Sequence, residues 1–130
     1  MKVVVDTNVI VSALMNTHGV PARILSMILE KELTILHDNR VIFEYIDVLF
    51  REKFGFNDEI ISGTINFFRH DGEFVNAIFS NKNFKDETDK KFYEVYKSGN
   101  ADFLITGNKK HFPNEKGIVT PKEFLELLHK

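Results

Sequence analysis

The chain contains no cysteine, which excludes disulfides, cysteine-ligated zinc and a thiol nucleophile. Long apolar runs are absent as well, since none approaches the ~20 residues that a membrane-spanning helix needs. The apolar run that follows Lys2 is too short for a secretory signal. These absences predict a cytoplasmic protein without membrane contacts.

Positive charge is not in excess: 17 Lys and Arg oppose 19 Asp and Glu, for a net charge of -2. This balance argues against a protein that holds nucleic acid by a broad basic face. The charges are unevenly spread, because residues 81–116 hold eight Lys against six acids, whereas residues 1–80 hold seven Lys and Arg against eleven acids. Residues 81–116 therefore form either a basic rim around an acidic pocket or, more commonly, a solvated lysine-rich loop.

Internal repeats, low-complexity segments and Pro/Gly/Ser-rich linkers are absent too. The 130 residues are 43% hydrophobic and include 13 Phe, which is enough for one hydrophobic core. We therefore expect a single domain over residues 1–130.

Short apolar segments alternate with amphipathic ones along the chain. Strands are predicted at 3–5, 33–36, 74–79, 103–106 and 118–119, and helices at 8–15, 21–30, 39–53, 58–70, 89–97 and from 121 onward. Asp38, Asn57 and Thr120 occupy predicted N-cap positions, and Thr120 opens a capping box. Strands that alternate with helices predict an α/β domain with a parallel sheet covered on both faces.

The first strand ends abruptly on Asp6, which is followed by Thr7 and Asn8. In an open α/β sheet, ligands bind in the crevice outside the carboxyl ends of the strands, so this carboxylate is placed where a site would be. Asp is also a favoured N-cap residue, so the alternative interpretation is that Asp6 caps the next helix. These residues alone leave both interpretations open.

Asp89 shares its helix face with the aromatic residues Phe92 and Tyr93, which lie three and four positions further on. A semi-buried carboxylate costs several kcal/mol unless a cation or hydrogen-bond donors accompany it. This favours a functional role for Asp89 over simple stabilisation of the helix N-terminus. Asp86 and Glu87 in the preceding loop are expected to be ordinary solvated acids.

Glu44 falls on the one polar stripe of an otherwise apolar helix, together with Arg40, Asp47 and Arg51. Arg40 and Glu44, like Asp47 and Arg51, are four positions apart. The spacing predicts two surface ion pairs.

Asn108 follows the fourth predicted strand directly after Thr106 and Gly107, so it too lies at the carboxyl edge of the sheet. Asp102 is at the opposite end of that strand, more than ~10 Å from Thr106. We therefore do not expect Asp102 to be a ligand.

Four motifs in this order resemble one known family over nearly the whole chain. They are Asp6-Thr7-Asn8-Val9-Ile10, Phe43-Glu44-Tyr45, the segment 86–92, and the segment 101–108 followed by His111-Phe112-Pro113. Together they resemble a PIN domain (the PilT N-terminal type), and more narrowly the toxin components of toxin-antitoxin systems.

The resemblance implies a three-layer α/β/α fold around a five-stranded parallel sheet, and a metal-dependent endoribonuclease that acts on RNA. The order 3-2-1-4-5 is required if Asp6 and Asn108 are to share a crevice. The implied catalytic residues and metal ligands are Asp6, Glu44, Asp89 and Asn108, with Thr7, Asn8 and Thr106 in supporting positions. It also implies an antitoxin protein as a partner and a homodimer.

Many members of the family carry Asp where this chain has Asn108. An amide oxygen still ligates hard cations, and a site made of oxygen ligands favours Mg²⁺ or Mn²⁺.

A non-catalytic PIN-like binding domain with a decayed acidic site is the alternative. A phosphatase of the haloacid-dehalogenase type would need a second Asp at position 8, and a receiver-type signalling domain would need its Asp at the end of a later strand; the second predicted strand lacks one.

Several other residues have two interpretations. Lys90, Lys109 and Lys110 either approach the RNA backbone or are solvated, and His111 either positions a phosphate or, by preference, hydrogen-bonds to the backbone. The aromatic residues expected to pack in the core are Phe43, Phe50, Phe67, Phe68, Phe79 and Phe84. The helix at 21–30 is apolar over so much of its circumference that we expect it to support the homodimer.

Overall fold

The five strands of this computed structural model, which describes residues 1–129, form one parallel sheet in the order β3-β2-β1-β4-β5. The strands are β1 (Lys2–Val5), β2 (Thr34–His37), β3 (Glu73–Phe74), β4 (Phe103–Ile105) and β5 (Ile118–Val119). The α-helices are α1 (Thr7–Met15), α2 (Val20–Leu29), α3 (Asn39–Leu49), α4 (Asp58–Asp71), α5 (Lys90–Ser98) and α6 (Pro121–Leu128), with 3₁₀ turns η1 (Glu52–Phe54), η2 (Glu87–Asp89) and η3 (Lys109–His111). The predicted sheet order is confirmed.

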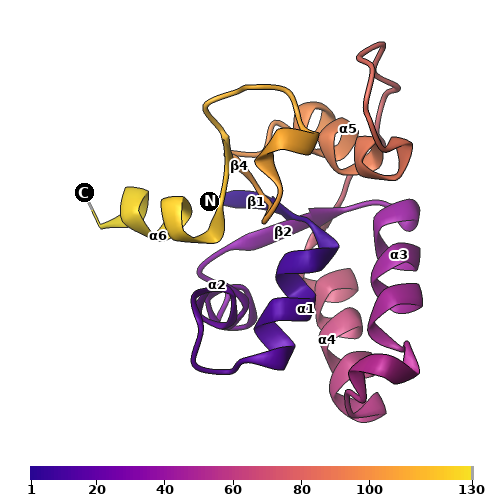
Figure 1. Ribbon diagram of the computed structural model, residues 1–130, viewed down its shortest axis with the longest axis vertical. Coiled ribbons are helices and arrows are strands. Elements are labelled where there is room, and N and C mark those ends of the chain that lie inside the picture. The colour runs from indigo at the N-terminus through magenta and orange to yellow at the C-terminus, as the bar shows by residue number, and fades with distance from the viewer. Residues whose placement is uncertain (130) are drawn as a thin grey trace.

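Helices cover both faces of the sheet, with α1, α2 and α4 on one side and α5 on the other (Figure 1). The central strand β1 is flanked by β2 and β4, and its three valines are completely buried. A strand buried on both faces is apolar at every position, which is why this segment shows no alternation. In the described part of the chain, no helix combines the length and apolarity that crossing a bilayer requires.

The predicted helix starts are confirmed by their capping hydrogen bonds. The Asp38 carboxylate accepts from the Val41 N–H at 3.0 Å, and the Asn57 side chain accepts from two amides in the first turn of α4. Thr120 and Glu123 form the complete capping box of α6. These caps satisfy amides that have no partner within the helix, so the elements start where the sequence predicts.

The third strand is far shorter than the predicted 74–79. Val75 donates its N–H to the carbonyl of His37 at 2.8 Å, and there the pairing ends. β2 turns into α3 at Asp38, so residues beyond Val75 have no strand to pair with. Ile78 and Phe79, which suggested a longer strand, are therefore solvent-exposed, at 76% and 86%.

The prediction of core packing is wrong for Phe79, for Phe43 of α3 and for Phe50, which directly follows that helix. Phe43 is 61% exposed and Phe50 is 41% exposed, because both lie on the side of α3 that faces solvent. Phe68 is completely buried, as predicted. Phe67 and Phe84 are partly buried and pack against the core, again as predicted.

The third helix ends at Leu49 rather than at residue 53. Phe50 and Arg51 leave the helical path, and the 3₁₀ turn η1 follows. Gly55 then adopts a left-handed conformation (φ 63°), which a glycine accommodates without strain. The chain can therefore reverse direction before α4.

Candidate active site

The parallel pairing of β1 with β4 brings Asp6 and Thr106 together at the carboxyl edge of the sheet. Val5 is in register with Ile105, and the Asp6 N–H donates to the Ile105 carbonyl at 2.9 Å. The Thr106 hydroxyl then donates to the Asp6 carboxylate at 2.8 Å. Asp6 occupies the N-cap position of α1, but its side chain makes no capping hydrogen bond, so the cap does not account for this carboxylate.

Asp6 is buried next to other negative charges. It is only 5% exposed, and its pKa is raised from 3.8 to about 6. Burial is the largest cause; the hydrogen bond from Thr106 opposes it, and the negative charges of Asp89 and Glu44 raise the pKa further. The three predicted carboxylates therefore share one electrostatic environment.

Glu44 is held by two donors from different elements. The Thr7 hydroxyl donates to one of its oxygens, and the Lys91 ammonium lies 2.7 Å from the other. The Lys91 and Glu44 side chains are 14% and 23% exposed, so this pair is half-buried rather than on the surface. The predicted Arg40–Glu44 pair is wrong.

Arg40 turns instead toward Asp38 and Glu94, which it contacts at 2.7 Å and 2.8 Å. Glu94 is only 2% exposed and also accepts the Ser80 N–H at 2.7 Å. A carboxylate buried this deeply requires a cation, and Arg40 is the cation that reaches it. The other predicted pair, Asp47 with Arg51, is confirmed at 3.0 Å.

Asp89 ends the turn η2 and faces His111. The Nδ1 atom of His111 lies 3.1 Å from the Asp89 carboxylate, so the imidazole contacts an acid rather than the predicted backbone group. Burial raises the pKa of Asp89, and the hydrogen bond with His111 opposes that rise. The predicted inward position of Asp89 is confirmed, since its side chain is 15% exposed.

The remaining predicted positions line the rim. The Asn8 side chain accepts the Gly107 N–H at 3.3 Å, which joins the start of α1 to the turn after β4. Asn108 donates its N–H to the Thr106 hydroxyl at 3.0 Å, and its side chain is exposed. Asp102 accepts the Lys2 N–H at 2.8 Å, at the other end of the strands, as predicted.

The donor set is chemically suited to a hard divalent cation, because carboxylate and amide oxygens are the ligands that Mg²⁺ and Mn²⁺ prefer. Within residues 1–129, however, no three acidic or histidine side chains are grouped closely enough to hold one ion as they stand. Both oxygens of Glu44 are engaged, by Thr7 and Lys91. The protein thus supplies its own cation beside one of the three carboxylates.

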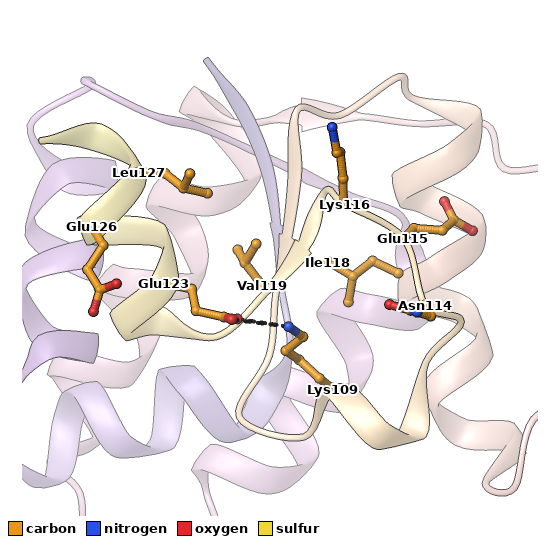
Figure 2. Close-up of a pocket in the computed structure, with 9 residues that line it drawn as sticks. All are labelled: Lys109, Asn114, Glu115, Lys116, Ile118, Val119, Glu123, Glu126 and Leu127. Carbon is orange, nitrogen blue, oxygen red and sulfur yellow. Dashed lines mark hydrogen bonds and ion pairs between the residues drawn. The ribbon is translucent and has the colours of Figure 1, made fainter. Parts of the chain in front are cut away.

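A surface hollow of about 510 Å³ lies between η3, β5 and α6 (Figure 2), and none of these three carboxylates lines it. The Lys109 ammonium crosses it to Glu123 at 3.1 Å. Lys109 is therefore turned away from the acidic site, and neither of its predicted interpretations, RNA contact or free solvation, describes it.

Sequence reasoning missed two residues that hold the site in place. The Tyr45 hydroxyl donates to the Val5 carbonyl at 2.5 Å, one residue before Asp6, and the Tyr45 side chain is completely buried. The second is Lys91, which contacts Glu44. The sequence suggests its neighbour Lys90 instead, but the Lys90 ammonium lies 3.9 Å from Glu87 near the surface. A lysine doublet gives no signal as to which member turns inward.

Comparison with known proteins agrees with this arrangement. A model of the PIN domain matches residues 2–110, which include all four predicted ligand positions. The uncharacterized protein MJ1680 of Methanocaldococcus jannaschii is 31% identical over 149 aligned positions, covering 100% of this chain and 93% of that protein. The chain belongs to the PIN domain family, whose members are generally nucleases.

Proposed function

We propose that this PIN domain is a metal-dependent endoribonuclease that hydrolyses phosphodiester bonds in single-stranded RNA. The observation that supports it is the raised pKa of Asp6, about 6, in a site where the charges of Asp89 and Glu44 add to the effect of burial. Carboxylates that repel one another in a partly dehydrated crevice favour a bound cation.

The residues that would hold Mg²⁺ or Mn²⁺ are Asp6, Glu44, Asp89 and Asn108. A bound ion of this kind lowers the pKa of a coordinated water and stabilises negative charge on phosphate oxygens. The protein's own groups orient the ligands: the Thr106 hydroxyl holds Asp6, and the Thr7 hydroxyl holds Glu44. Such supporting hydrogen bonds keep ligand oxygens aimed at the site.

A cleavage assay with purified protein tests the proposal. Unstructured RNA should be cut in the presence of Mg²⁺ or Mn²⁺ and left intact in EDTA. A protein that cuts no RNA with either ion, and binds neither ion by calorimetry, would instead be a PIN-like binding domain whose acidic site has decayed. Asn108, an amide where many relatives carry an acid, is the feature that favours this alternative.

By resemblance to the toxin branch, we also propose a cytoplasmic toxin that is held in check by a small antitoxin protein and forms a homodimer. The apolar face of α2 is a weaker argument for the dimer than it was from sequence, because Ile24, Leu25 and Ile28 are buried in the monomer core. Leu29 remains exposed on that helix. Light scattering that shows a monomer at every concentration would remove the dimer.

Asn108→Asp should tighten Mn²⁺ binding about tenfold, because one more carboxylate at the rim adds the attraction of one charge. RNA cleavage should be kept or increased. Asn108 is exposed and bonded through its backbone to Thr106, so the substitution should not disturb folding. Calorimetric titration with Mn²⁺ measures the change, and an unaltered affinity would place residue 108 outside the site.

A further inference from the structure

A second, basic hollow lies beside the acidic site. It has a volume of about 340 Å³ and is formed by two segments, residues 82–85 and residues 110–113. Both segments lie on the α5 side of the sheet (Figure 1). Three lysines contribute to its lining, Lys82, Lys85 and Lys110, and no carboxylate does. We call it the lysine hollow.

None of the three lysines forms an ion pair within residues 1–129, in contrast to Lys90, Lys91 and Lys109. Glu115, on the neighbouring loop, is already engaged by Lys97 at 3.1 Å and by the hydroxyl of Tyr93 at 2.5 Å. In a chain with a net charge of -2, such a cluster of lysines without ion-pair partners is a local exception. It matches the lysine-rich stretch that the sequence shows.

Aromatic packing fixes the two segments relative to each other. Phe84 meets Phe112 edge-to-face with ring centroids 5.9 Å apart, and it also packs against Tyr93 of α5 at 5.6 Å. Aromatic contacts of this kind stabilise packing beyond simple burial. The lysines are therefore carried by segments that are packed together rather than by two independent loops.

The hollow adjoins the acidic site, because His111 belongs to its lining and also contacts the Asp89 carboxylate at 3.1 Å. We infer that the lysine hollow binds the phosphate backbone of single-stranded RNA and directs it toward Asp89. This inference rests on the ribonuclease function proposed above, and it assigns Lys82, Lys85 and Lys110 to substrate binding. The contacts are to phosphates, so binding is largely independent of base sequence.

The position favours RNA over an acidic protein segment as the occupant. A polyanion that must reach the carboxylates is repelled by them, and free lysines at the entrance offset that repulsion along the approach. The footprint is small, since three lysines neutralise about three phosphates. Release of counterions from single strands then predicts a salt dependence of binding with a slope of about -2 on logarithmic axes.

The test replaces Lys82, Lys85 and Lys110 together with Gln and measures binding of a labelled, unstructured RNA by fluorescence anisotropy in EDTA. The control replaces Lys53, Lys116 and Lys122, three other exposed lysines, and removes the same total charge. We expect the first variant to lose at least about tenfold in affinity, with the salt slope weaker by about 2, whereas the control stays close to the wild type.

Cleavage assays with Mn²⁺ separate this inference from the proposed function. If the wild type cuts RNA and both triple variants have the same KM and the same affinity, the lysine hollow is not the RNA site, although the ribonuclease function stands. If the wild type cuts no RNA, and RNA affinity falls in the first variant but not in the control, the hollow binds RNA and the ribonuclease function fails. An acidic peptide that binds the wild type where RNA does not would overturn RNA as the occupant.

Discussion

Asp6→Asn is expected to abolish metal-dependent RNA cleavage and to leave the fold intact. The substitution keeps the shape of the side chain and an oxygen that accepts the Thr106 hydroxyl, but it removes the charge at the centre of the site. Loss of a carboxylate ligand weakens both the binding of a cation and its positioning, so we expect activity to fall by at least about a hundredfold. Steady-state cleavage of a labelled RNA with Mn²⁺ measures the loss.

The same substitution should stabilise the metal-free protein at neutral pH. The pKa of Asp6 rises from 3.8 in the unfolded chain to about 6 in the folded protein, so the native state binds the proton more tightly. The raised pKa therefore lowers the free energy of unfolding of the wild type. This loss is absent below about pH 4, grows as the pH rises toward 6, and is complete above that value. Its full size is about 1–3 kcal/mol.

Thermal unfolding in EDTA at several pH values tests this expectation. The melting temperature of Asp6→Asn should exceed that of the wild type at pH 7.5, and the difference should shrink toward about pH 4. Asp102→Asn provides a control, since it makes the same chemical change at the opposite end of the strands. A large loss of stability in Asp6→Asn at neutral pH would show that the carboxylate caps α1 after all.

The carboxyl ends of β1 and β4 could be predicted from the sequence because the chain signals them locally. In both strands an apolar run is followed at once by a polar residue, which identifies Asp6 and Thr106 as strand ends. The parallel register then places them side by side. The caps of α3, α4 and α6 are equally local, since each involves residues within three positions of one another. Features of this kind need no knowledge of distant packing.

The ion pairs could not be predicted, because they depend on which helix packs beside which. Spacing within α3 suggests that Arg40 pairs with Glu44. An ion pair between residues four apart in one helix nevertheless competes with pairs to charged residues on neighbouring helices. The packing of α3 near α5 gives each residue a different partner: Arg40 contacts Glu94, and Glu44 contacts Lys91. A buried carboxylate gains more from a cation than an exposed one does, so Glu94 takes the arginine.

The exposed segment after β3 was mispredicted for a related reason. Ile78 and Phe79 are residue types that are common in strands, but a strand forms only where a neighbour offers free backbone groups. Beyond Val75 the neighbouring chain has already entered α3. The Ser80 N–H bonds to Glu94 instead, which draws the segment toward α5.

Lys91→Met is expected to destabilise the metal-free protein and to strengthen its response to Mn²⁺. The substitution leaves Glu44, 23% exposed, without the ammonium that lies 2.7 Å from it. We expect a loss of about 1–2 kcal/mol in EDTA, less than for a fully buried pair because water still reaches the carboxylate.

The same change makes the site more negative by one charge, and Glu44 becomes free to face a cation. Mn²⁺ should therefore bind about tenfold more tightly and raise the melting temperature of Lys91→Met more than that of the wild type. Lys90→Met is the matched control, because it removes the same charge one residue away. The Lys90 ammonium lies 3.9 Å from the exposed Glu87 and not beside Glu44. Equal responses to Mn²⁺ in the two variants would mean that Lys91 does not compete for the acidic site, and that Glu44 is bound to a structural partner rather than kept ready for a metal.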